Sequence, residues 1–253
     1  MATRIINKNA SLWASPKAKL SVPFNAAWEG FFSFGVDAAT SVRNLIEGGA
    51  ALSVIGSPTY GANYIELTGA QMAYLVTSIK NSTDMTIVAT VKPLEEKGIA
   101  VVSDYQSQRA DNTGLCLGTS LAFDVGSNNG NGNVITRFQH SVLVSGVSTG
   151  ASAETATESP INQWYMISGR CKNSDRTRRV NNLTAGTSGT NSPAANPADL
   201  GDVFRLGSAY NSQYPGKCQL CEVAIISEYI SDADFSTLTQ LMRASAAKKG
   251  IIL

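Results

Sequence analysis

The clearest signal in the chain is an alternation of apolar and polar positions over residues 85–91. Met85, Ile87, Ala89 and Val91 fall on one side of an extended chain, and the residues between them fall on the other. This period of two predicts a β-strand. Pro93 is expected to end it, because proline has no amide hydrogen to donate to a sheet.

Short apolar runs recur along most of the chain at intervals of about 8 to 15 residues, with Gly, Pro, Asn and Ser between them. Residues 98–103 are apolar almost throughout, as in a strand covered on both faces. Residues 145–159 and 181–200 are polar and aperiodic, so we expect loops there. The regular spacing of these short apolar runs, with no expected helix between them, predicts an all-β sandwich. The further expected strands are residues 52–55, 64–67, 74–77, 115–117, 121–125, 134–138, 163–171, 176–180, 203–206 and 218–229.

One helix is expected near the C-terminus, at about residues 232–248. Ser231 can cap it, and Asp234 follows three residues later as an acidic form of the capping box. An apolar stripe continues at helical spacing, and Gly250 can end the helix. A single helix beside so many strands is expected to lie on the outside of the sandwich. The stripe consists of Phe235, Leu238, Met242 and Ala246.

The first 28 residues form a predicted arm, and residues 29–253 a single domain. Ser, Lys, Asn and Pro interrupt the arm, and its large aromatic residues Trp13, Phe24 and Trp28 follow no period. Such residues pack on a neighbouring surface. Docking on a partner and folding back on the arm's own domain both remain open. The arm has no apolar core of the kind that a secretory signal requires.

The charge balance argues against several partners. The chain has 20 Lys+Arg and 19 Asp+Glu, a net charge of +1, so no overall field favours nucleic acid. The cluster Arg176–Arg179 is expected on a solvated hairpin. No run reaches the roughly 18 apolar residues that a membrane helix needs, and we expect no membrane insertion.

The four cysteines do not form a metal-binding pattern. Cys218 and Cys221 form a C-x-x-C motif, but residues three apart on a strand point to opposite faces. His140 is the only histidine, so no Cys/His set completes a zinc site. We interpret the cysteines as buried structural residues and expect no cofactor and no metal.

The order of features from about residue 163 onward resembles the concanavalin-A-like and laminin-G-like jelly-roll superfamily. The matching features are the strand from Trp164, the pattern Phe204-Arg-Leu-Gly207, the strand 216–226 and the helix start at 230–234. The resemblance implies an antiparallel jelly-roll β-sandwich with one C-terminal α-helix. The segments 31–49 and 54–67 also resemble jelly-roll proteins of tailed bacteriophages and prophages.

The superfamily includes glycoside hydrolases, whose acidic residues alternate along one strand. Alternation places the carboxylates on one face at a spacing suited to catalysis. No such triplet occurs here, and Glu66, Asp124, Glu222 and Glu228 each lack an acidic neighbour two residues later. His140 lies in no serine-hydrolase motif, and no nucleotide-binding fingerprint is present. We therefore predict that the protein is not an enzyme.

Two loops offer side chains suited to ligand binding. The first contains Tyr105, Asp111 and Asn112, and the second contains Tyr210 and Tyr214. Tyrosine rings and amides suit sugar rings and their hydroxyls. Both stretches are also compatible with ordinary solvated loops. Many members of the superfamily bind calcium, but no dense carboxylate cluster supports calcium here.

These observations lead to two functional hypotheses. The first is a non-enzymatic structural or attachment protein of a bacteriophage particle, a decoration or tail-associated module made in the bacterial cytoplasm and found in the virion. Its partners would be other virion proteins and copies of itself. The alternative is a lectin-like module that recognises host-surface glycans. A glycoside hydrolase is a third and weaker hypothesis.

Overall fold

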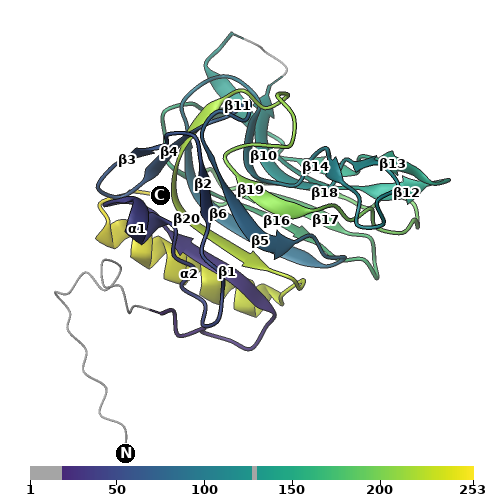
Figure 1. Ribbon diagram of the computed structural model, residues 1–253, viewed down its shortest axis with the longest axis horizontal. Coiled ribbons are helices and arrows are strands. Elements are labelled where there is room, and N and C mark those ends of the chain that lie inside the picture. Colours follow the sequence, from purple (N-terminus) through teal and green to yellow (C-terminus); the bar gives the residue numbers. More distant parts are fainter. Residues whose placement is uncertain (1–18, 127–129) are drawn as a thin grey trace, which may run out of the picture.

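Two eight-stranded antiparallel sheets packed face to face form the body of the protein (Figure 1). The computed structural model describes residues 19–126 and 130–253. The first sheet has the strand order β18-β17-β16-β6-β20-β4-β3, with β1 also paired to β20, and we call it the helix-covered sheet. Its strands are β1 (Trp28–Ser33), β3 (Thr59–Tyr60), β4 (Ile65–Thr68), β6 (Met85–Pro93), β16 (Tyr165–Cys171), β17 (Arg178–Asn182), β18 (Thr187–Asn191) and β20 (Lys217–Ile226).

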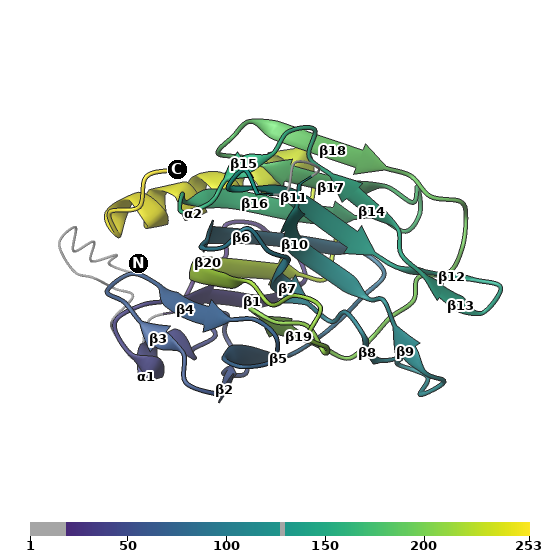
Figure 2. The same cartoon turned by 90° about the horizontal axis from the view of Figure 1, so that it is seen from above.

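The second sheet has the order β14-β11-β10-β7-β19-β5-β2, with β15 also paired to β11, and we call it the open-faced sheet. Its strands are β2 (Ser53–Ile55), β5 (Tyr74–Lys80), β7 (Ile99–Ser103), β10 (Thr119–Val125), β11 (Asn133–His140), β14 (Ser152–Glu154), β15 (Ser159–Pro160) and β19 (Val203–Leu206). Two small hairpins project from one end of the sandwich (Figure 2). They are β8–β9 (Ser107–Gln108 and Leu115–Cys116) and β12–β13 (Val142–Val144 and Val147–Thr149).

The core lies between the sheets and follows the alternation in the sequence. The apolar set from Met85 to Val91 points into it, as predicted. Facing strands of the open-faced sheet contribute Leu121, Phe123 and Phe138. Gly169 is required where Phe138 crosses β16, because a methyl group there would overlap the phenyl ring. The predicted all-β jelly-roll sandwich is confirmed.

Helix α2 (Asp232–Lys248) covers the outer face of the helix-covered sheet, over β6 and β20 (Figure 1). Ser231 accepts a hydrogen bond from the Asp234 amide at 3.1 Å, and its hydroxyl bonds the Asp234 carboxylate at 2.7 Å. The predicted apolar stripe is buried against this sheet. Among the described residues, neither α2 nor the short α1 (Ala38–Ser41) is long and apolar enough to span a membrane.

Both segments expected to be loops contain strands. Residues 145–159 hold β13, β14 and the start of β15, and residues 181–200 hold the end of β17 and all of β18. These strands are short, and most of their positions are polar because they lie at sheet edges or in the projecting hairpin. The side chain of Asn191 bridges the two sheets at this edge, donating to the Ser152 carbonyl at 2.7 Å.

The basic cluster 176–179 is only partly solvated, contrary to the prediction. Arg178 is 1% exposed. Side chains on β17 alternate between its two faces, and the Arg178 side chain lies on the buried face, opposite to Arg179. Its Nε donates to the His140 carbonyl at 3.1 Å, and its Nη1 donates to the Arg176 carbonyl at 3.0 Å. Backbone carbonyls thus stabilise this buried cation.

The described part of the predicted arm lies against its own domain. Strand β1 already begins at Trp28, which is paired with Ile226 of β20. The rings of Phe24 and Trp28 lie 5.1 Å apart, and both pack against the cluster under α2. Trp13 lies outside the described residues. A partner-docking role for these three aromatic residues stays a prediction.

Candidate functional site

The outer face of the open-faced sheet carries the candidate site. On β10, Leu121 and Phe123 point into the core, so Ala122 and Asp124 point outward. On β11, the core position Phe138 leaves Arg137 and its alternate neighbours on the outer face. A strand pair with an apolar inner face and a polar outer face is the usual arrangement of an antiparallel sheet with one solvated side.

A loop, residues 207–216, covers the middle of this outer face. The loop begins at Gly207, whose φ of +81° is a backbone conformation that residues other than glycine rarely adopt. The Tyr210 amide donates to the Tyr105 carbonyl at 3.0 Å, and the Gly216 amide donates to the Gly98 carbonyl at 2.9 Å. The loop buries the outer side of β7, which explains why the run 98–103 is apolar on both faces.

Tyr214 fixes the loop to the sheet. Its ring packs on Ala100 and Ala122, and only 5% of the residue is exposed. The Tyr105 ring meets it edge to face, with the centroids 5.7 Å apart. The Tyr105 hydroxyl then donates to Gln213 Oε1 at 2.8 Å. Burial raises the pKa of Tyr214 far above its usual value, so this hydroxyl stays protonated.

An open hollow of about 420 Å³ lies beside the loop 207–216, where the loop no longer covers the sheet. Its volume is within the usual range of small-ligand sites. Most of its surface is polar, and the backbone of Gly98 forms part of it. The lining residues are Gly98, Asp124, Val125, Ile135, Arg137, Glu154, Gln213 and Tyr214.

Arg137 organises the polar groups of the hollow. Its Nη1 donates to Asp124 Oδ2 at 2.8 Å, and its Nη2 donates to Gln139 Oε1 at 3.1 Å. Its Nε lies 3.7 Å from Glu154 Oε1 on β14. Burial lowers the pKa of Arg137, but the hydrogen bond and charge of Asp124 outweigh it, and the pKa lies above its ordinary value. The guanidinium therefore holds the Asp124 carboxylate and the Gln139 amide by hydrogen bonds, and the Glu154 carboxylate lies near it without one.

The predicted ligand residues Tyr105, Tyr210 and Tyr214 come together at this loop, mainly through packing. The Tyr210 hydroxyl donates to the Val203 carbonyl at 2.8 Å, and the Arg205 guanidinium lies 3.6 Å from the centre of its ring. Burial raises the pKa of Tyr210 to about 12. Of the three, Tyr214 lines the hollow.

Asp111 and Asn112 lie elsewhere, in the turn of the β8–β9 hairpin, and neither lines the hollow. Asp111 Oδ1 accepts from the Thr113 amide at 2.9 Å and from its hydroxyl at 2.6 Å. The hydrogen bonds from Thr113 lower the pKa of Asp111. Asn112 has a φ of +61°, which asparagine tolerates well. These contacts define a turn.

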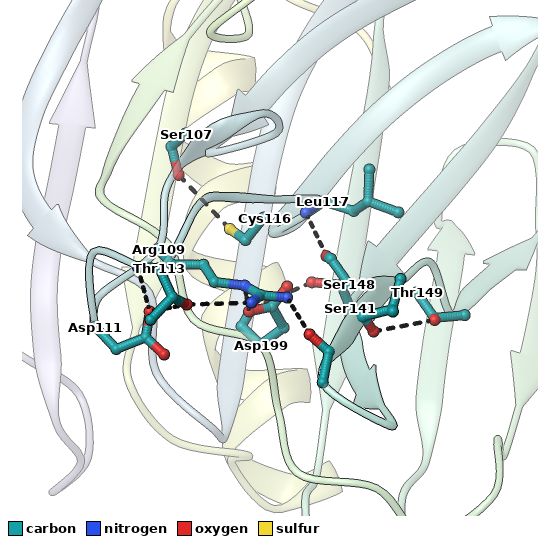
Figure 3. Close-up of polar contacts among 12 residues, drawn as sticks. Ser107, Arg109, Asp111, Thr113, Cys116, Leu117, Ser141, Ser148, Thr149 and Asp199 are labelled. Atoms are coloured by element: carbon teal, nitrogen blue, oxygen red, sulfur yellow. Dashed lines mark hydrogen bonds and ion pairs between the residues drawn. The ribbon is translucent and has the colours of Figure 1, made fainter.

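Arg109 ties this hairpin to its neighbour (Figure 3). Its Nε lies 3.0 Å from the buried carboxylate of Asp199. Its Nη2 donates to the Gly146 carbonyl of the β12–β13 turn at 3.2 Å, and its Nη1 donates to the Thr113 hydroxyl at 3.2 Å. One guanidinium thus links three chain segments at this end of the sandwich.

The cysteines are buried structural residues, as predicted. All four are free and buried. Cys218 points into the core between the sheets, and Cys221 points toward α2, so the two thiols lie on opposite faces of β20. Within residues 19–126 and 130–253, no group of three or more His, Cys, Asp or Glu side chains is arranged to hold a metal ion.

Asp124, Arg137, Glu154 and Gln213 were not predicted as site residues. A signal for two of them was present in the sequence. A polar run separates the two apolar runs of β10 and β11, and antiparallel pairing of these runs places Asp124 opposite Ile135 on the outer face, diagonal to Arg137. Nothing near Glu154 or Gln213 in the sequence indicates that they approach this pair, because both arrive through long-range packing.

No protein-family model matches the chain, and no curated protein matches its sequence. Solved structures do match its fold. The botulinum neurotoxin serotype D binding domain is 11% identical, with 85% of this chain and 51% of that chain covered and a TM-score of 0.56. The binding domain of Paraclostridial Mosquitocidal Protein 1 is 14% identical, with 83% and 51% covered and a TM-score of 0.56.

A third similar structure is the botulinum neurotoxin serotype D ligand binding domain in complex with N-acetylneuraminic acid. It is 9% identical, with 85% of this chain and 50% of that chain covered and a TM-score of 0.55. The chain thus spans about half the length of these structures. At such low identities the likeness shows the β-sandwich fold alone.

Proposed function

We propose that the protein is a non-enzymatic carbohydrate-binding module and that the hollow beside Tyr214 is its binding site. The observation that carries this proposal is the fixed array around Arg137 in an open hollow on the outer face of the sheet. Asp124 and Glu154 supply hydrogen-bond acceptors, and Arg137 and the Gln213 amide supply donors. Sugar hydroxyls donate and accept, so they match such a mixed array.

The structural neighbours support a binding role. They are described as binding domains, and one was solved with a bound sugar, N-acetylneuraminic acid. A hydrolase would use one carboxyl of the hollow to protonate a leaving group. Here Asp124 and Glu154 both face the same guanidinium. That arrangement suits two fixed acceptors better than an acid and a nucleophile.

The role in a bacteriophage particle stays a prediction from the sequence. It is compatible with the present proposal, because a glycan-binding module could serve a particle that attaches to a cell surface. Purification of intact particles followed by peptide mass spectrometry would test that role. Absence of the chain from such particles would count against it and leave the glycan proposal standing.

A steric variant tests the binding proposal without removing any polar group. A methyl group at Gly98 would lie 3.2 Å from the Tyr214 ring and 3.7 Å from Asp124 Oδ1, so a larger side chain there would occupy the hollow. We expect Gly98→Val to abolish binding on a glycan array while its thermal transition stays cooperative. Wild-type protein that binds no glycan would refute the proposal, as would unchanged binding by a folded Gly98→Val variant.

Side-chain variants then locate the contacts. Gln213→Ala and Asp124→Asn are each expected to weaken glycan binding about tenfold, the effect of losing one or two hydrogen bonds. Gln240→Ala, on the exposed side of α2, and Asp175→Asn, in the turn after β16, are matched controls. Equal losses in the controls and the test variants would show that the hollow is not the binding site.

A further inference from the structure

The charges around the hollow narrow the class of sugar that it can accept. Two carboxylates and one guanidinium line it. Asp124 and Glu154 lie there together with Arg137. Counting the two carboxylates against the guanidinium gives a local charge of −1.

Two nitrogens of the Arg137 guanidinium already donate to protein oxygens. Nη1 of Arg137 faces Asp124 at 2.8 Å, Nη2 faces Gln139 at 3.1 Å, and Nε faces Glu154 at 3.7 Å. A strong bond to a ligand carboxylate needs two nitrogens of the guanidinium aligned in a free fork. Here Nη1 and Nη2 each already donate to a protein oxygen, and Nε is buried without a hydrogen bond, so an incoming carboxylate meets no fork of two fully free nitrogens.

Lys97, the residue before Gly98, does not offset this charge, because its Nζ lies 3.3 Å from Glu95 Oε1. The remaining polar lining groups, Gln213 and Tyr214, carry no charge at neutral pH. The acceptors of the hollow therefore suit hydroxyl donors and oppose anions.

We propose that the hollow selects uncharged sugars and disfavours sialylated and other anionic glycans. This inference rests on the proposed carbohydrate-binding function. It separates the chain from its structural neighbour with bound N-acetylneuraminic acid, an anionic sugar. Because that likeness shows the fold alone, the ligand class follows from this chain's own side chains.

The test compares matched pairs of glycans on the full chain. An array would carry uncharged oligosaccharides, each beside its sialylated or uronic-acid counterpart, for example lactose and 3′-sialyllactose. Affinities for the binding pairs would then be measured by biolayer interferometry. We expect the anionic member of each pair to bind about tenfold more weakly at low salt. The difference should shrink near 0.5 M salt, because the Debye length falls well below its value of about 10 Å at 0.1 M, and salt screens charges that lie farther apart than this length.

A charge variant separates electrostatic from steric exclusion. Glu154→Gln removes one negative charge from the hollow, and it should reduce the discrimination about threefold. Glu47→Gln makes the same change at an exposed position between α1 and β2 and should leave discrimination unchanged. Discrimination that responds to neither salt nor Glu154→Gln would overturn the electrostatic inference.

The remaining outcomes distinguish the two proposals. Equal or tighter binding of the anionic members overturns the inference on selectivity and leaves the carbohydrate-binding function standing. Binding of neither member of any pair overturns the carbohydrate-binding function and the inference with it.

Discussion

Two substitutions of Tyr214 should separate its role in packing from its role in binding. Tyr214→Ala removes a ring that is 95% buried between the loop 207–216 and the sheet. Truncation of a buried aromatic ring costs about 3–5 kcal/mol. About 1 kcal/mol of that belongs to the edge-to-face contact with Tyr105. We therefore expect a loss of about 3 kcal/mol, because the ring lies at the rim of the fold, away from the main core.

Tyr214→Phe keeps the ring and removes the hydroxyl. Among the described residues, none hydrogen-bonds this hydroxyl, and the residue lines the hollow. The free energy of unfolding should therefore change by less than about 0.5 kcal/mol. Glycan affinity should fall about three- to tenfold, the effect of one lost hydrogen bond.

Urea unfolding and glycan titration of the same samples measure both quantities. Tyr229→Phe makes the same chemical change on a ring beside Arg170, on the helix-covered side of the sandwich, and should change neither. A large loss of stability in Tyr214→Phe would show that the hydroxyl has a structural partner. Full binding by Tyr214→Ala would refute the placement of the site.

Three further predictions concern the parts of the fold that support the site. Lys249→Met should cost about 3–5 kcal/mol at pH 7, because it leaves the fully buried Glu222 without its cation. Burial raises the pKa of Glu222 above its usual 4.5, so the folded state binds the proton more tightly. The loss of stability in Lys249→Met should thus grow as pH rises above the folded-state pKa of Glu222, which lies above 4.5, and shrink on acidification. Urea titrations across pH would measure this, and a loss that shrinks as pH rises would contradict it. Arg109→Ala should speed amide exchange in β12–β13 about tenfold by releasing Gly146, and unchanged exchange would contradict the link. Burial raises the pKa of all four cysteine thiols to about 12, so a thiol reagent should label them only as fast as the protein unfolds, and rapid labelling of folded protein would contradict their burial.

The sequence predicts the parts of the fold that depend on local pattern. Strand β6 follows from its alternation and α2 from its cap and apolar stripe, and both match the structure closely. Strands β13 and β14 were missed for a physical reason. Each is three residues long and mostly polar, and its hydrogen bonds come from partners that no local pattern identifies. Arg178 was misplaced because a charged side chain can be buried when backbone carbonyls surround it.

The candidate site was harder to predict than the fold. Tyr214 was singled out for its chemistry, but the sequence suggested an exposed ring, whereas the residue is buried under the loop and lines the hollow. The contact between Tyr105 and Gln213 joins residues 108 positions apart. Such contacts are set by how the sheets and the loop pack together, which single-sequence patterns do not reveal.

The position of the hollow nevertheless follows from a change in residue type along β10. Ala122 is small and lies under the loop, beside Ala100 of β7. The next outward residue, Asp124, is charged and reaches Arg137. Covering Asp124 with the loop would cost this carboxylate its solvation, which favours a loop that ends before Asp124. The loop 207–216 therefore covers the part of the sheet whose outward-facing residues are small. Beyond Ala122, strand β10 presents the polar side chain of Asp124 to solvent. A ligand with hydroxyl groups can replace water there.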